Sequence, residues 1–338
     1  DPGELRALIE RRAIAGVFVT TRNIRDLNAE AIRAEIASFQ AIRKRQNLQP
    51  LLIATDQEGG AVSRMSPPLP RDVTLGEIVS LHADPAERLM AIRQFATRKG
   101  KALADLGVNL NFAPVVDLNH NIVIAGDRYT RIQQRAISDD PKIVTEAAGA
   151  YCEGLIGTGV HCTLKHFPGL GRVVEDTHLD DADLTAPLAV LEATDWMPFR
   201  RLMNRQGVFT MLGHARLTAM DRVMPASASR AVVAGLLREQ WKHDGILVTD
   251  DFSMGAIYGA PGGLPAAGVA SLNAGVDLIL ISYDTDLYYP VMHAMMKADA
   301  AGRVDRTQLD RSADRIKRIM AVKASTRTRP GETARPFP

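Results

Sequence analysis

The sequence predicts an α/β fold in a single domain, and more narrowly a (β/α)8 (TIM) barrel. Three observations support this prediction: short apolar runs recur along the chain, stretches of helical periodicity separate them, and polar residues follow nearly every run. Apolar strands that alternate with helices are typical of parallel strands buried on both faces. The carboxyl ends of all strands meet at one rim of a barrel, whereas a doubly wound sheet gathers only those near its switch point. The many polar strand ends therefore favour the barrel.

Seven runs are expected to form strands, and they lie at residues 16–20, 51–55, 108–112, 162–165, 208–212, 246–249 and 276–281. Between the first two, Ile32, Ile36 and Phe39 recur at the spacing of one helix face. Further helices are expected near residues 84–105, 141–157, 188–206, 229–241 and 263–274. A complete barrel needs an eighth strand, which we expect upstream of Asp1 because the chain opens on a helical pattern. We expect the catalytic barrel to occupy residues 1–325 and an exposed tail to occupy residues 326–338.

The composition excludes several classes of protein. With 338 residues, of which 46% are hydrophobic and 24% charged, the chain is typical of a soluble globular protein. Its 41 Lys and Arg nearly balance 39 Asp and Glu, and no run of like charge stands out, so no nucleic-acid partner is expected. No apolar run approaches the roughly 20 residues that span a bilayer. The first residues lack a signal-peptide pattern, but the missing initiator Met leaves a removed leader open. We expect a monomer.

The chain has two cysteines, Cys152 and Cys162. Their spacing matches neither a disulfide framework nor a zinc motif. Because free cysteines are among the most buried residue types, we predict two thiols in the core.

Acidic residues follow two of the expected strands. Asp250 and Asp251 end the run ILVTDD, where a carboxylate at the edge of a buried strand is costly unless it is paired or used. Asp251 could simply cap the following turn. Asp56 and Glu58 form a second acidic cluster, and Asp56 could bind a polyhydroxylated ligand. Arg64 could form a salt bridge with Asp56 or reach the same ligand.

The stretch KHFPGLGRVVEDTH concentrates polar chemistry after another strand. Lys165 and His166 lie at the strand end, and Asp176 and His178 follow on a loop rich in Gly and Pro. A histidine two residues from an aspartate can donate one ring N–H to it, which leaves the other nitrogen free for proton transfer near neutral pH. Two alternatives remain: an exposed histidine without function, and a zinc site from His166, Asp176 and His178, which lacks a recognisable ligand spacing.

Five stretches occur in an order that resembles a known family: ATDQEGGAVSRM, LGVNLNFAPVVDLN, KHFPGLGRVVEDTH, LLREQWKHDGILVTDDFS and TDDFSMGAI. They are similar to glycoside hydrolase family 3, in its branch of single-domain bacterial β-N-acetylglucosaminidases. The resemblance implies a carbohydrate substrate, either a muropeptide containing N-acetylglucosamine or a chitooligosaccharide, and no metal or organic cofactor. A role in cell-wall recycling implies the cytoplasm, whereas a removed leader would imply the periplasm or the cell surface.

The resemblance also implies residue roles. It assigns Asp250 as the nucleophile of a retaining exo-glycosidase, and His178, oriented by Asp176, as the general acid/base in place of the usual second carboxylate. The loop that carries His178 is expected to close over substrate as a lid. Five further residues match family positions around the terminal sugar: Asp56, Arg64, Arg135, Lys165 and His166.

The chain departs from the family pattern in three places. Leu170 stands where the family has a second loop histidine, and a proline that the family has shortly after the Asp-x-His pair is absent after His178. The stretch before Arg135 also differs, which leaves Arg128 and Arg131 as rivals for its role. Three alternative functions remain open: a family 3 β-glucosidase, a phosphorylase, because a neutral histidine tolerates incoming phosphate, and an inactive barrel that only binds cell-wall fragments. The combination of Asp250, Asp176 and His178 favours an enzyme.

Overall fold

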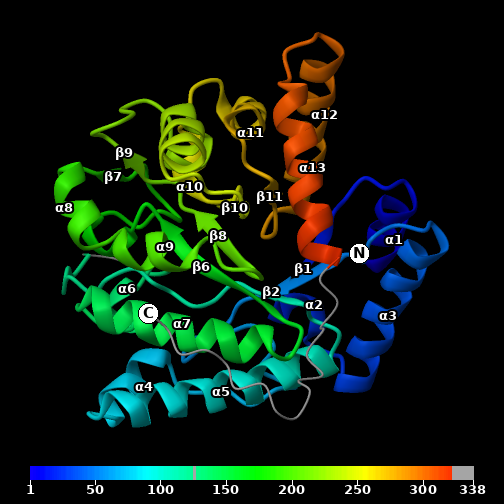
Figure 1. Cartoon of the computed structure of the whole chain (residues 1–338). Coiled ribbons are helices and arrows are strands. Elements are labelled where there is room, and N and C mark those ends of the chain that lie inside the picture. The colour runs from blue at the N-terminus through cyan, green and yellow to red at the C-terminus, as the bar shows by residue number, and fades with distance from the viewer. Residues whose placement is uncertain (125–126, 322–338) are drawn as a thin grey trace.

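The computed structural model describes residues 1–124 and 127–321, and its centre is a parallel sheet of seven strands (Figure 1). The strands are β1 (Gly16–Val19), β2 (Leu52–Thr55), β5 (Leu110–Asn111), β6 (His161–Phe167), β8 (Val208–Leu212), β10 (Ile246–Asp251) and β11 (Leu278–Leu280). They match the seven predicted runs. Their order in the sheet is β1-β2-β5-β6-β8-β10-β11, the same as in the chain, and every pairing is parallel. A doubly wound sheet would reverse direction, so the barrel prediction is confirmed.

Helices pack around the outside of these strands (Figure 1). The longer ones are α1 (Pro2–Glu10), α3 (Ala29–Arg45), α4 (Leu75–Leu81), α5 (Pro85–Asp105), α7 (Pro141–Ile156), α11 (Gly263–Ala274), α12 (Tyr288–Ala300) and α13 (Arg306–Ala321). The predicted face of α3 is buried, with Ile32, Ile36 and Phe39 at most 5% exposed. The side chain of Asn28 caps this helix by accepting a hydrogen bond from the backbone N–H of Ala31 at 2.8 Å. Every helix in residues 1–124 and 127–321 is too short or too polar to cross a membrane.

Shorter helices and strands lie in the segments that connect the sheet strands with the longer helices. They are α2 (Thr21–Ile24), β3 (Gln57–Gly59), β4 (Val62–Ser63), α6 (Ile132–Arg135), η1 (Leu170–Arg172), β7 (Asp183–Leu184), β9 (Arg216–Leu217), η2 (Ala226–Ala228), α10 (Gly255–Tyr258) and η4 (Thr285–Leu287). The helix expected near 229–241 is the π-helical segment η3 (Ala231–Gln240).

The helix expected near 188–206 is divided into α8 (Leu188–Ala193) and α9 (Met197–Leu202). Pro198 lies in the first turn of α9, where its missing N–H costs nothing, so the chain can restart a helix there. The break frees Asp195, whose buried carboxylate binds His120 at 2.9 Å and Arg172 at 2.8 Å. The prediction of one continuous helix was wrong. The contacts of Asp195 join residues that are distant in sequence, so they leave no local signal of the break.

The sheet does not close between its first and last strands. Among the described residues no strand pairs with the free edge of β1 or of β11. Instead, Ile316 and Ile319 of α13, like Leu278 of β11, pack against the buried cluster inside the barrel. Helix α13 therefore covers this end of the sheet (Figure 1). An eighth strand upstream of Asp1 stays a prediction, and the expected tail at 326–338 lies outside the described residues.

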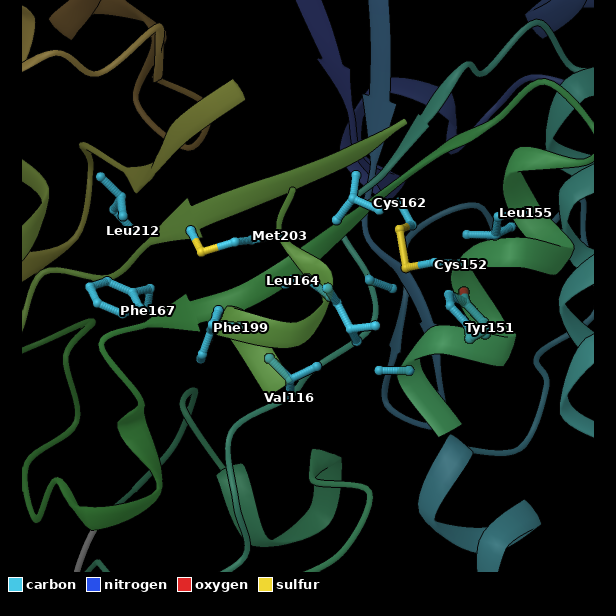
Figure 2. Close-up of a cluster of buried hydrophobic side chains, with 14 of the residues drawn as sticks. Val116, Tyr151, Cys152, Leu155, Cys162, Leu164, Phe167, Phe199, Met203 and Leu212 are labelled. Carbon is cyan, nitrogen blue, oxygen red and sulfur yellow. A yellow bond between two sulfur atoms is a disulfide. The ribbon is translucent and has the colours of Figure 1, made fainter. Parts of the chain in front are cut away.

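The two cysteines form a disulfide, so the prediction of two free thiols was wrong. Figure 2 shows Cys152 on α7 bonded to Cys162 on β6 within the buried cluster that also contains Leu155. Helix α7 packs against β6, and the connecting turn places the two Cα atoms 5.4 Å apart, within disulfide range. A separation of ten residues across a helix, a turn and a strand has no sequence motif, which is why the pairing was missed.

Candidate active site

Charged side chains from the segment after β2, which includes β3, and from β6 and α6 form an ion-pair network at the carboxyl-end rim. The ammonium of Lys165 lies 2.6 Å from Asp56 and 2.6 Å from Glu58. The guanidinium of Arg135 binds both oxygens of Glu58, at 2.7 and 3.0 Å. Two cations thus face two carboxylates, and Asp56 keeps 22% of its side chain exposed toward solvent.

Burial and pairing act against each other in this network. Burial would raise the pKa of Glu58, but the charges of Arg135 and Lys165 outweigh it and hold that pKa well below its usual range. Burial would lower the pKa of Lys165, but Asp56 and Glu58 outweigh it and raise that pKa. Glu58 and Lys165 are therefore both charged at neutral pH, and their mutual pairing is what makes the buried charges tolerable.

His166 follows Lys165 near the carboxyl end of β6. The pairing of β6 with β8 is irregular between Leu164 and Phe167, and the peptide between Lys165 and His166 is cis. Asp117 accepts hydrogen bonds from the backbone N–H of His166 at 3.0 Å and of Leu170 at 2.7 Å, and its carboxylate lies 2.7 Å from His166 Nδ1. The side chain of Leu170 is buried in the core.

This pairing directs His166 Nε2 toward Asp250, 4.0 Å away. Sequence reasoning missed Asp117 as the residue that orients His166, although the residue lies in the family-like stretch VVDLN.

Asp250 and Asp251 have different environments at the end of β10. Burial would raise the pKa of Asp250, but the imidazoles of His166, His214 and His178, together with the N–H of Asp251, lower it. Asp250 is therefore ionised and 15% exposed, as a nucleophile requires. The carboxylate of Asp251 instead accepts hydrogen bonds from Ser253, Ser282 and Tyr283, so it ties β10 to the segment after β11.

His214 follows β8 and is fully buried. Its ring lies 2.8 Å from the hydroxyl of Ser227 and 3.1 Å from the carbonyl of Asp251. Burial lowers its pKa, and the charge of Asp250 acts in the opposite direction. His214 thus supports the strand end beneath Asp250.

Asp176 and His178 form a contact on the loop after β6. Oδ1 of Asp176 lies 3.1 Å from Nδ1 of His178 and accepts a hydrogen bond from Thr130 Oγ1 at 2.7 Å. Its other oxygen accepts from the backbone N–H groups of Arg128 and Tyr129, both at 3.1 Å. Burial would raise the pKa of Asp176, but these hydrogen bonds outweigh it and lower the pKa to about 2.

The same contact fixes the histidine. Nε2 of His178 has no hydrogen-bond partner in the described part of the chain, and the side chain is 36% exposed. The nitrogen that could exchange a proton is therefore unpaired among the described residues, on a partly exposed side chain. His178 is close enough to Asp250 to influence its pKa, so both lie at the same end of the barrel.

Three tethers hold the loop that carries His178. The backbone N–H groups of Gly255 and Ala256 donate to the carbonyls of His178 at 2.8 Å and of Thr177 at 3.2 Å. A Cβ at position 255 would approach the Leu179 carbonyl oxygen to 2.3 Å, so only glycine fits there. The third tether is Arg216, which binds two aspartates of the loop, Asp181 at 2.9 Å and Asp183 at 2.6 Å. Closure of this loop as a lid stays a prediction.

Of the two predicted site arginines, Arg135 belongs to the ion-pair network and Arg64 does not. Arg135 contacts Glu58 and lies 3.4 Å from His166, whereas its rivals Arg128 and Arg131 are exposed. Arg64 is also exposed, and its backbone N–H, not its side chain, contacts Asp56. Of the two alternatives for Arg64, the salt bridge with Asp56 is not formed, because Lys165 pairs with Asp56 instead. In residues 1–124 and 127–321, no group of three or more His, Cys, Asp or Glu is arranged to hold a metal ion.

Comparisons with known proteins agree with this geometry. Residues 2–319 match the model of the glycosyl hydrolase family 3 N-terminal domain. A beta-hexosaminidase of Xanthomonas euvesicatoria pv. vesicatoria is 35% identical over 279 residues, which cover 82% of this chain and 79% of that protein.

Two solved structures share the fold. A family 3 glycosyl hydrolase from Mycobacterium smegmatis superposes with a TM-score of 0.80 at 30% identity, covering 94% of this chain and 92% of that one. A family 3 beta-N-acetylglucosaminidase from Paenibacillus gives a TM-score of 0.83 at 28% identity, covering 97% of this chain and 61% of that one. The matched family model and these relatives show that the chain belongs to glycosyl hydrolase family 3 and is a glycoside hydrolase.

Proposed function

We propose that the protein is a retaining exo-β-N-acetylglucosaminidase that removes terminal N-acetylglucosamine from muropeptides or chitooligosaccharides. The observation that carries this proposal is the Asp176–His178 contact at the same rim as the ionised Asp250. Relatives named beta-hexosaminidase and a beta-N-acetylglucosaminidase of the same fold support the acetamido sugar as substrate.

The reaction proceeds in two displacements. First, an oxygen of Asp250 bonds to the anomeric carbon while the bond to the leaving oxygen breaks, and His178 Nε2 gives its proton to that oxygen. Next, His178 takes a proton from water, the water oxygen bonds to the anomeric carbon, and the ester to Asp250 breaks. Two inversions at one carbon retain the configuration.

The ion-pair network supports recognition of a terminal sugar. Asp56, Lys165 and Arg135 offer carboxylate oxygens and N–H groups to sugar hydroxyls, and His166 lies between this network and Asp250. Lys165 and Glu58 are almost fully buried, so the network is a fixed part of the barrel rim on which a terminal sugar can be recognised. Arg64, exposed at the rim, can reach a sugar from the solvent side.

Release of nitrophenol tests this proposal. We expect turnover of 4-nitrophenyl β-N-acetylglucosaminide well above that of the β-glucoside, with near-total loss in Asp250→Ala and a loss of at least roughly a hundredfold in His178→Ala. A dinitrophenyl leaving group, which needs little protonation, should restore most of the His178→Ala rate but none of the Asp250→Ala rate. Equal turnover of both sugars would contradict the substrate, and dependence on added phosphate would indicate a phosphorylase.

The disulfide bears on where the protein works. Disulfides persist in oxidising compartments and are rare in the cytosol. The bond between Cys152 and Cys162 therefore supports the periplasm or the cell surface rather than the cytoplasm. Thiol labelling of protein from its native cells, denatured without reductant, should find both cysteines blocked, whereas two reactive thiols would support the cytoplasm.

A further inference from the structure

One exposed aromatic side chain lies directly beside the proposed acid/base. The ring of Tyr129 is 5.5 Å from the ring of His178, centroid to centroid, and the two planes meet at 43°. Tyr129 is 55% exposed, which makes it one of the large side chains that the fold leaves open to solvent. Within the described chain its hydroxyl forms no hydrogen bond.

The Tyr129 ring is not needed to hold the dyad in place. The backbone N–H of Tyr129 binds Asp176 at 3.1 Å, and the Thr130 hydroxyl binds the same carboxylate at 2.7 Å. Asp127 in turn fixes the segment by accepting a hydrogen bond from the backbone N–H of Arg131 at 2.8 Å. The main chain and Thr130 therefore position Asp176, while the Tyr129 side chain is free to contact a ligand.

The chemistry places a sugar next to this ring. His178 Nε2 must lie within hydrogen-bond distance of the glycosidic oxygen that it protonates, so the leaving sugar begins directly beside the imidazole. The terminal sugar occupies the side with Lys165 and Asp56, and the leaving sugar must extend from His178 toward solvent. Tyr129 is the exposed ring in contact with His178. A pyranose presents faces of C–H groups, which pack favourably on an aromatic face.

We propose that Tyr129 forms the binding platform for the leaving-group sugar, the residue immediately beyond the scissile bond. This inference rests on the proposed function, because it needs His178 as the proton donor. It assigns a determinant of leaving-group preference to Tyr129, in the stretch before Arg135 where the sequence departs from the family pattern.

Two substrates with similar leaving oxygens test the platform. N,N′-diacetylchitobiose carries a sugar ring as leaving group, and methyl β-N-acetylglucosaminide carries only a methyl group. We expect Tyr129→Ala to lower kcat/KM for the disaccharide about tenfold, chiefly through KM, and to leave kcat/KM for the methyl glycoside within about twofold. Tyr129→Phe keeps the aromatic face and should retain the disaccharide rate.

Tyr289→Ala is the matched control. Tyr289 is also an exposed tyrosine, but it lies on α12 and donates its hydroxyl to Glu4, so neither substrate should be affected. An equal loss on both substrates in Tyr129→Ala, with a shifted pH profile, would mean that the ring only positions His178 and would overturn the platform. An unchanged disaccharide rate would overturn it as well. If the wild-type protein hydrolysed neither acetamido substrate, the proposed function itself would fail and the platform with it.

Discussion

The ion-pair network and the Asp176–His178 dyad are built in different ways at the same rim. Glu58 of the network lies on β3 and Lys165 on β6, and both are at most 9% exposed, whereas His178 lies on a loop with 36% of its side chain exposed. The network is held by charge pairs, and the dyad mainly by hydrogen bonds from one segment, residues 128–130. The difference suits two tasks: a fixed surface recognises the terminal sugar, and an accessible imidazole exchanges protons with a leaving group and then with water.

Removing the central cation of the network should have the largest effect. Lys165→Met keeps most of the side-chain volume but leaves Asp56 and Glu58 facing each other without their shared partner. We expect a loss of about 3–5 kcal/mol in the free energy of unfolding, measured by urea denaturation, because buried charges lose their compensation. The exposed Lys101→Met on α5 is a control that should change stability little. A wild-type midpoint in Lys165→Met would contradict the network as described.

Weakening the dyad should affect activity more than stability. Thr130→Val preserves shape but removes the hydroxyl that donates to Asp176. We expect kcat/KM to fall about tenfold, because a hydrogen bond to a charged group is lost and His178 is held less well. Thr145→Val, which removes only a hydroxyl bonded to the Pro141 carbonyl on α7, should leave kcat/KM unchanged. Equal rates in the two variants would show that Asp176 does not depend on Thr130.

The pH dependence of stability should report the ionisation of Asp176. Since folding lowers the pKa of Asp176 from 3.8 to about 2, the ionised carboxylate stabilises the folded state. That contribution is complete above about pH 4 and is lost as the pH falls toward 2. We expect Asp176→Asn to lower the unfolding free energy at pH 6. The difference in unfolding free energy between this variant and the wild type should then shrink as the pH falls from about 4 toward 2. A difference that stays constant down to pH 2 would argue against the pKa assignment.

The smallest expected effect concerns the outer tether of the loop. Arg216 binds Asp181 and Asp183, whose side chains are 44% and 40% exposed. Exposed ion pairs contribute about 0–1 kcal/mol, so Arg216→Ala should barely change the unfolding free energy. If the loop opens and closes during turnover, the same variant should raise KM with a modest change in kcat. A large stability loss would instead make this tether part of the core framework.

Sequence reasoning predicted most of the fold because its signals are local. Apolar runs indicated all seven strands, and the helix around Ile36 followed from spacing alone. The failures involve partners distant in sequence. The break before α9 depends on Asp195 meeting His120, 75 residues away, and the disulfide depends on how α7 packs on β6.

The candidate site shows the same division. Motifs brought Asp250, Lys165 and the pair of Asp176 and His178 to attention, but the residues that orient His166 and Asp176 came only from the structure. Asp117 is 49 residues from His166, and Thr130 is 46 residues from Asp176. A side-chain contact across such separations leaves no periodicity or spacing in one sequence, so the supporting residues could not have been predicted.

The most direct test of the account is to trap the covalent intermediate. A fluorinated N-acetylglucosaminyl fluoride forms the glycosyl-enzyme rapidly and releases it slowly, so the modified peptide can be mapped by mass spectrometry after digestion. With Asp250 as the nucleophile, we expect a single sugar attached to the carboxylate of Asp250, and no adduct in Asp250→Ala. A sugar attached to Asp251, Asp56 or Glu58, or inactivation without any adduct, would contradict Asp250 as the nucleophile.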